Sequence, residues 1–164
     1  MTTPARVEIS PADWLPDESQ WDKAGPFFDD DPVTAEGATH THAWAANHGC
    51  YAYAFTWPDG RWSQVDVRAR LSSEHPWYSS PPNHFSDVTL LVNAHAYPSR
   101  RVIADNGSGR EYHWCVEPEH LLAGENVLRF AVRRNARYRN GLCIYYRAVV
   151  AENEDCPITI SGET

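Results

Sequence analysis

Short runs with a large or apolar side chain at every second position constrain the fold of this chain more than any other sequence feature. Residues 51–57 place an aromatic ring at every second position, and residues 63–71 alternate valine, alanine or leucine with polar side chains. A period of two is typical of a strand with one buried face and one exposed face. Similar runs lie at residues 88–93, 111–116, 126–133 and 142–151. We therefore expect roughly seven or eight short strands, as in all-β sandwiches.

Turn residues, and not helical sequences, separate these runs. Pro58-Asp59-Gly60 and residues 105–109 are strong turn signals, and residues 119–124 are expected to form a turn or a single helical turn. Hardly any stretch has the period of a helix. The sequence therefore predicts an all-β fold, an antiparallel β-sandwich of the jelly-roll type.

The first part of the chain differs in composition from the rest. Residues 1–32 hold five of the twelve prolines and have no sustained alternation, which predicts an irregular N-terminal arm. The arm also carries several large rings, so we expect it to pack on the body of the domain. Residues 33–164 are then expected to form a single β-sandwich domain.

Charge and cysteine spacing exclude several classes of function. The net charge of −8 disfavours nucleic acid and anionic lipid as partners. No apolar run reaches the roughly 18 residues of a membrane span, and residues 1–16 lack the apolar centre of a signal peptide, so we expect a cytoplasmic protein. The cysteines have no zinc-ribbon or CxxC spacing, and we expect them to be free, mostly buried thiols, with disulfide pairing as the alternative. They are Cys50, Cys115, Cys143 and Cys156.

Three segments resemble a known family. The run Val88-Thr89-Leu90-Leu91-Val92-Asn93, the strand through Tyr112-His113-Trp114 and the motif Leu121-Leu122-Ala123-Gly124-Glu125-Asn126-Val127-Leu128 are similar to galactose-binding-like jelly rolls. That fold includes the sugar-binding domains of family 2 glycoside hydrolases and many carbohydrate-binding modules. Locally, Gly124 permits a tight turn and Asn126 is expected to bond to its backbone. The sequence departs from the pattern at Ala94, where a turn glycine is usual.

The outward positions of the predicted strands carry several arginines. If they share one sheet face, their guanidinium groups would bind a carboxylate, a phosphate or an acidic sugar through paired hydrogen bonds. Two rings in the proline-rich segment 74–84 would act as stacking platforms for a sugar ring. The alternative is that the arginines only solvate the sheet. The predicted ligand-binding residues are Trp77, Tyr78, Arg68, Arg70, Arg129, Arg133, Tyr145 and Arg147.

Four titratable residues are candidates for acid/base catalysis: His95, Glu111, His113 and Asp66. Glu111 and His113 share a strand face, and His95 follows the preceding strand, so we expect them to line one cleft. A histidine with a carboxylate neighbour is sufficient for proton transfer. Structural histidines also have such neighbours, and no established catalytic motif is present. The catalytic residues, and whether the protein is an enzyme, therefore stay open.

A structural Ca²⁺ ion is an implication of the family resemblance, because such jelly rolls often carry one near the chain ends. Its oxygen ligands would come from acidic residues at the two ends of the chain. The candidates are Asp29, Asp31 and Glu152, with solvated acidic ends as the alternative. No other cofactor is expected.

The leading functional prediction is a binding domain for a carbohydrate or a similar hydroxylated or anionic small ligand. One alternative is a small acid/base enzyme of specialised metabolism, a cyclase, isomerase or lyase that uses the sandwich cavity. Another is a protein-interaction domain, and a homo-oligomer is left open. The fold cannot decide between them, because jelly rolls host all three kinds of function.

Overall fold

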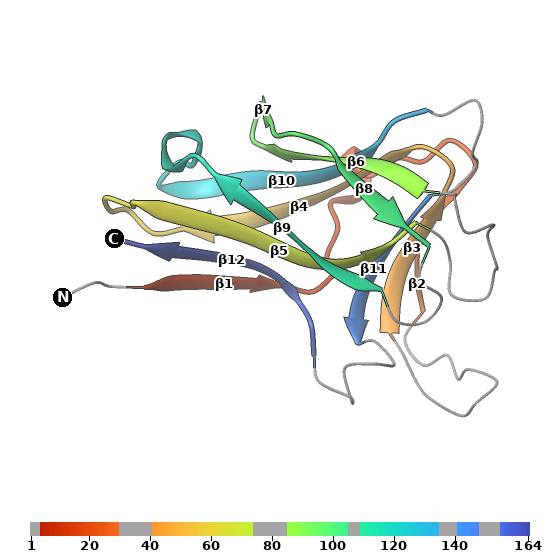
Figure 1. The fold of residues 1–164 in the computed structure, drawn as a ribbon, viewed down its shortest axis with the longest axis horizontal. Helices are drawn as coiled ribbons and strands as arrows, with labels where there is room; N and C mark the ends of the chain where they lie inside the picture. Colours follow the sequence, from red (N-terminus) through yellow and green to blue (C-terminus); the bar gives the residue numbers. More distant parts are fainter. Residues whose placement is uncertain (1–3, 30–40, 74–84, 105–108, 135–140, 148–154) are drawn as a thin grey trace.

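Two antiparallel β-sheets pack face to face and enclose the core (Figure 1). The computed structural model describes residues 4–29, 41–73, 85–104, 109–134, 141–147 and 155–164. The seven-stranded sheet contains β1 (Ala5–Ile9), β2 (Ala24–Asp29), β3 (Thr41–Ala46), β5 (Gln64–Ser72), β9 (Arg110–Val116), β11 (Gly141–Arg147) and β12 (Ile158–Glu163). The five-stranded sheet contains β4 (Gly49–Trp57), β6 (Phe85–Val92), β7 (His95–Ala96), β8 (Arg100–Ile103) and β10 (Gly124–Val132). The predicted all-β sandwich is confirmed.

Alternation along each strand decides which side chains enter the core. On β5 and β10 the apolar residues at every second position are buried, while the residues between them, which are polar on β5, point outward. Each sheet therefore has one face in the common core and one face outside, as the period of two predicts. The buried alternating residues include Val65, Val67, Ala69, Leu71, Val88, Leu90, Val92, Leu128, Phe130 and Val132.

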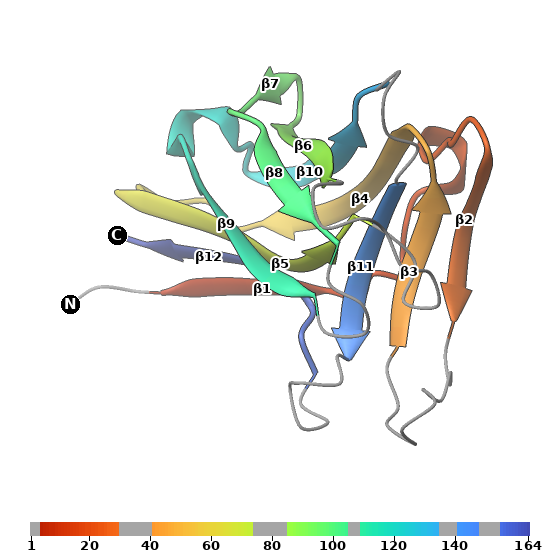
Figure 2. The same cartoon turned by 45° about the vertical axis from the view of Figure 1, so that its right-hand side comes forward.

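The central strand β5 divides the seven-stranded sheet into two wings. On one edge β5 pairs with β9 over residues 65–71. On its other edge it pairs with β12 as far as Arg68 and with β11 from Arg70 onward. The first wing, β12 and β1, therefore leaves β5 on one side of Ala69, and the second wing, β11, β3 and β2, on the other. Figure 2 shows the second wing running steeply across the direction of the first.

The N-terminal arm is more regular than expected. Instead of an irregular lead-in, it contains β1, which pairs with β12, and β2, which pairs with β3. Its prolines obscured these strands, because β1 has only five residues and is followed closely by Pro11. Trp14, Trp21 and Phe28 of this segment pack against the core.

Helix is confined to short turns in the described part of the chain. They are η1 (Pro16–Glu18) and η2 (Pro118–His120), and the second overlaps the helical turn expected near residues 119–124. Neither has the length and apolar character that crossing a lipid bilayer requires.

Asp22 fixes the turn between β3 and β4. Its carboxylate accepts hydrogen bonds from the Asn47 side chain at 2.7 Å and from the backbone N–H of His48 at 2.9 Å. Desolvation raises the pKa of Asp22, but the His48 N–H, the nearby imidazole and the Asn47 amide together lower it below 3.8. The turn is therefore held by the charged form of the carboxyl.

Asp22→Asn is expected to weaken the acid dependence of stability. A lowered carboxyl pKa stabilises the folded state above the ordinary pKa, and this stabilisation is lost as the pH falls through the lowered value. Urea unfolding of the wild type and the variant between about pH 6 and pH 2.5 measures the difference. If the free energy of unfolding fell equally with pH in the two proteins, the lowered pKa of Asp22 would be contradicted.

Candidate functional site

A groove of about 530 Å³ lies on the outer face of the seven-stranded sheet. Strand β5 contributes Arg68 and Arg70, β9 contributes Glu111, and β12 contributes Thr159 and Ser161. The remaining lining residues are Arg6, Ala69, Asp155, Cys156 and Pro157. The groove therefore combines positive charge with hydroxyl groups on one open surface.

The division of the sheet explains where this groove lies. β5 is bonded to β12 up to the pair Arg68–Thr159 and to β11 from the pair Arg70–Tyr145. Between these pairs, at Ala69, the two wings separate, and Ala69 and the residues just before β12 line the opening. Arg68 and Arg70 point outward on either side because they are two residues apart on one strand.

Hydrogen bonds orient the guanidinium groups around the groove. Arg68 Nη1 is 2.9 Å from Glu111 Oε1, and Arg70 Nη2 donates to the carbonyl of Gly109 at 3.3 Å. Arg6 is paired with Glu8 at 3.0 Å. A guanidinium has five N–H donors, more than any one of these bonds uses. Such a surface is suited to carboxylate, phosphate and hydroxyl oxygens.

The predicted arginine row does not lie on one sheet. Arg68, Arg70 and Tyr145 belong to the seven-stranded sheet, although Tyr145 is fully buried there. Arg129 lies on β10 and Arg133 directly follows it, which places them with the five-stranded sheet. The prediction of one shared face is wrong for these two, because alternation shows that a side chain points outward but not from which sheet. Arg129 instead pairs with Glu18.

Several predicted residues lie wholly or partly outside the described part of the chain. Trp77 and Tyr78, and the Ca²⁺ candidates Asp31 and Glu152, lie outside the described residues. Arg147 is the last residue of β11, opposite Thr41, and its side chain is also outside the described part. Asp29 ends β2, and its carboxylate is 3.4 Å from His42 Nε2.

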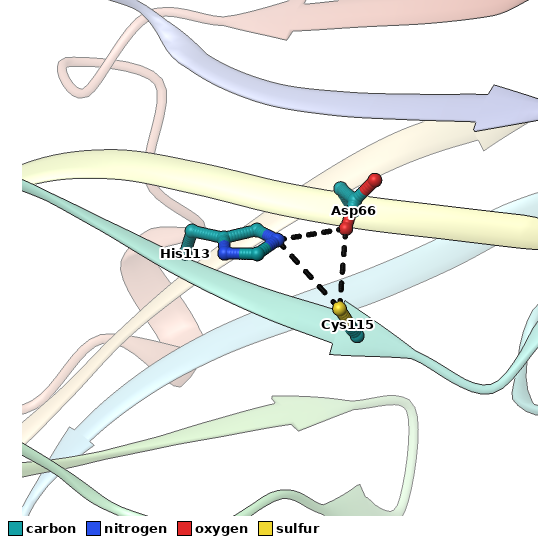
Figure 3. Close-up of side chains that lie close together, drawn as sticks. All are labelled: Asp66, His113 and Cys115. Atoms are coloured by element: carbon teal, nitrogen blue, oxygen red, sulfur yellow. Dashed lines mark hydrogen bonds and ion pairs between the residues drawn. The ribbon is translucent and has the colours of Figure 1, made fainter.

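A second constellation lies beside the groove, where Asp66, His113 and Cys115 meet on the outer face of β5 and β9 (Figure 3). Asp66 Oδ1 is 2.8 Å from His113 Nε2 and 3.4 Å from Cys115 Sγ, and the sulfur is 3.6 Å from the same nitrogen. Gln64 Nε2 donates to the other carboxylate oxygen of Asp66 at 3.0 Å.

The catalytic candidates do not line one cleft. His113 contacts Asp66, and Glu111 pairs with Arg68 on the same sheet. His95 lies on β7 of the five-stranded sheet, where its ring stacks on His120 with centroids 3.6 Å apart. The expected grouping of His95 with Glu111 and His113 is therefore wrong. Sequence reasoning also missed Cys115, although its spacing of two from His113 places both side chains on one strand face.

The surroundings of Cys115 do not favour the thiolate form that an activated nucleophile needs. Desolvation raises the pKa of Asp66, but hydrogen bonds from His113, Gln64 and Cys115 outweigh this effect and lower it. The hydrogen bond from the Cys115 thiol to Asp66, together with desolvation and the carboxylate charge, raises the pKa of that thiol. A raised pKa disfavours the thiolate that nucleophilic catalysis needs.

Comparison with known proteins identifies the fold. No protein-family model matches the sequence, and no curated protein matches it. A native family 35 carbohydrate-binding module from Clostridium thermocellum aligns with a TM-score of 0.56 and 11% identity, covering 95% of this chain and 97% of that module.

Two other solved structures align over nearly the whole chain. The isomalto-dextranase of Arthrobacter globiformis T6 aligns with a TM-score of 0.50 and 12% identity over 97% of this chain, which spans 23% of that enzyme. The C-terminal family 6 module of LamC, a laminarinase from Zobellia galactanivorans, aligns with a TM-score of 0.49 and 13% identity, covering 95% of this chain and 98% of that structure. At such identities the likeness concerns the fold. This chain has the jelly-roll β-sandwich fold of a carbohydrate-binding module, as the resemblance of its sequence implied.

Proposed function

We propose that this domain binds a carbohydrate, or a similar hydroxylated ligand that carries an anionic group, in the groove on the seven-stranded sheet. The observation that carries the proposal is the clustering of Arg6, Arg68 and Arg70 with the hydroxyls of Thr159 and Ser161 around one opening. The shared fold with a family 35 carbohydrate-binding module supports it.

The groove offers complementary partners to the parts of an acidic sugar. Guanidinium forks match the two oxygens of a carboxylate. The hydroxyl of Ser161 both donates and accepts, as sugar hydroxyls do. The Thr159 hydroxyl, which donates to the Pro157 carbonyl at 3.2 Å, and the Glu111 carboxylate both accept from a hydroxyl. Trp77 and Tyr78 remain proposed stacking platforms for a sugar ring.

A structural Ca²⁺ ion at Asp29, Asp31 and Glu152 also remains a prediction, and the groove does not require it.

Arg68→Gln is expected to weaken ligand binding by at least about tenfold, which is about 1.4 kcal/mol. The reason is the loss of a charge-assisted hydrogen bond, worth about 1.5–3 kcal/mol. A glycan array containing neutral and uronic-acid oligosaccharides selects the ligand, and isothermal titration measures its affinity. We expect acidic oligosaccharides to bind best and their affinity to fall as salt is added.

Two further variants make this test specific. Arg133→Gln removes the same charge from an exposed position after β10 and should leave affinity unchanged. Arg68→Gln/Glu111→Gln removes both members of the ion pair, so repulsion by an unpaired Glu111 cannot explain weaker binding in it. The absence of any glycan bound by the wild type, or an equal loss in Arg133→Gln, would contradict a binding site in this groove.

A further inference from the structure

The register of two strands brings Asp66, His113 and Cys115 together. His113 and Cys115 are two residues apart on β9 and project from the same face. Asp66 on β5 is directly opposite Cys115, and Arg68 is directly opposite His113. Directly paired residues have Cβ atoms about 4.5–5.5 Å apart, so three functional groups from two strands reach one point. All three side chains lie on the outer face of the sheet (Figure 3).

Two of the three distances between the donor atoms are already close to the edge lengths of a metal coordination tetrahedron. With bonds of about 2.3 Å to sulfur and about 2.0–2.2 Å to nitrogen and oxygen, tetrahedral Zn²⁺ separates sulfur from either partner by about 3.6 Å and nitrogen from oxygen by about 3.4 Å. The sulfur lies 3.6 Å from His113 Nε2 and 3.4 Å from Asp66 Oδ1. Only the nitrogen–oxygen distance, 2.8 Å in a direct hydrogen bond, must lengthen.

The same geometry does not fit a cysteine–histidine–aspartate relay. In such a relay the imidazole uses one ring nitrogen for the carboxylate and the other for the thiol. Here His113 Nε2 faces both Asp66 and Cys115. Donor atoms that converge on one another in this way are arranged as ligands around a common point.

The chemistry of the donors selects the kind of metal. Thiolate, imidazole and carboxylate together suit Zn²⁺, whereas Ca²⁺ and Mg²⁺ prefer sets made of oxygen atoms alone. Gln64 donates to Asp66 Oδ2, which leaves Oδ1 directed at the other two donors. Such a hydrogen bond is the usual way in which a neighbouring side chain orients a ligating carboxylate.

We propose that Asp66, His113 and Cys115 form a three-ligand Zn²⁺ site on the outer face of the sheet, with its fourth position open. On binding, the Cys115 thiol gives its proton to solvent, and the proton that His113 Nε2 shares with Asp66 moves through solvent to Nδ1, so that the sulfur and Nε2 are both free to bond to the metal. The open position is accessible, because Cys115 is exposed and 43% of the His113 side chain is exposed. Ser161 of the groove lies opposite Asp66 on β12, so the metal would sit beside the groove.

The test is direct metal binding by the reduced protein, after any purification tag is removed. Isothermal titration with Zn²⁺ alone should show one equivalent bound. Titration with Co²⁺ should give a sulfur-to-cobalt charge-transfer band together with the intense visible absorption of a tetrahedral site. We expect Cys115→Ser to abolish the charge-transfer band and weaken Zn²⁺ binding by at least about 100-fold, and Gln64→Ala to weaken it by about tenfold.

Matched variants separate this site from adventitious binding. Cys50→Ser removes a thiol from the other sheet, and His95→Gln disrupts the stacked pair of His95 and His120, and both should bind Zn²⁺ as the wild type does. Thermal unfolding in EDTA verifies that each variant is folded, and added Zn²⁺ should raise the unfolding temperature of the wild type but not of Cys115→Ser. Absence of stoichiometric binding, equal affinity of Cys115→Ser and wild type, or loss of binding in His95→Gln would overturn the proposal.

The outcome is independent of the proposed carbohydrate function. The titrations use metal without sugar, and the variants leave Arg68 and Arg70 in place. A protein that binds Zn²⁺ but no glycan would uphold this inference and contradict the other, and the reverse result would do the opposite.

Discussion

Asn126→Asp is expected to lower the free energy of unfolding by about 3 kcal/mol or more, because it disrupts a buried and fully bonded amide. The Asn126 Oδ1 atom accepts from the Leu122 N–H at 2.8 Å and from Asn93 Nδ2 at 3.0 Å. Its Nδ2 atom donates to the carbonyls of Leu122 and Gly124 at 2.9 and 3.0 Å. A carboxylate of the same shape cannot donate, so two carbonyls would face a negatively charged oxygen.

Urea unfolding followed by tryptophan fluorescence measures this loss. Glu125→Gln changes one charge at the exposed neighbouring position and should alter stability by less than about 0.5 kcal/mol. A comparable loss in both variants would contradict a special role of the Asn126 hydrogen-bond network. The turn motif around Gly124 and Asn126 thus has the local role that its residues predicted.

Gly141→Ala is expected to cost about 3 kcal/mol, the upper end of the usual range for overpacking. A Cβ atom at Gly141 would lie 2.0 Å from the carbonyl oxygen of Ala45 on the neighbouring strand β3. The backbone of Gly141 cannot easily move away, because its N–H donates to Ser73 and its carbonyl accepts from Ser86 at 2.7 Å. Relief of the clash must therefore break bonds to two other segments.

Gly124→Ala provides the comparison in a thermal unfolding experiment. Gly124 has a φ of +100° but open space where a Cβ would stand, so its substitution carries only a conformational cost of about 1 kcal/mol. We expect the unfolding temperature to fall clearly further for Gly141→Ala than for Gly124→Ala. The opposite order would contradict the close approach of β11 to β3.

Strand alternation predicted the longer strands and their buried faces, because burial of every second residue is a local property of β-structure. Residues 51–57, 63–71 and 126–133 correspond to β4, β5 and β10. Assignment of a strand to one sheet or the other depends on pairing between distant segments, which alternation does not record. Arg68 and Arg129 both point outward as predicted, yet they belong to different sheets.

The short strands escaped prediction for a related reason. β1 and β12 have five and six residues, and their ladder joins the two ends of the chain. Gly141 directly precedes the predicted run 142–151, but it is already paired with Ala46 on β3. Stability in these segments comes from their partners more than from their own residues.

The candidate site was predicted only in part. Arg68, Arg70, Asp66 and His113 were among the candidates, and they lie on one sheet face. Cys115 was absent, since its significance depends on the register that sets Asp66 opposite it. The only indication in the sequence was the pattern His113-Trp114-Cys115, in which one metal-ligating side chain lies on each side of a core tryptophan.

Because the sheet divides at Ala69, both wings pair with the same edge of β5. β12 pairs with β5 over Gln64–Arg68, and its residues Ile158 and Ile160 are fully buried, so the first wing is anchored both to β5 and to the core. The opening between Thr159 and Arg70 is therefore a consequence of the backbone branching itself, in addition to the side chains along its margins.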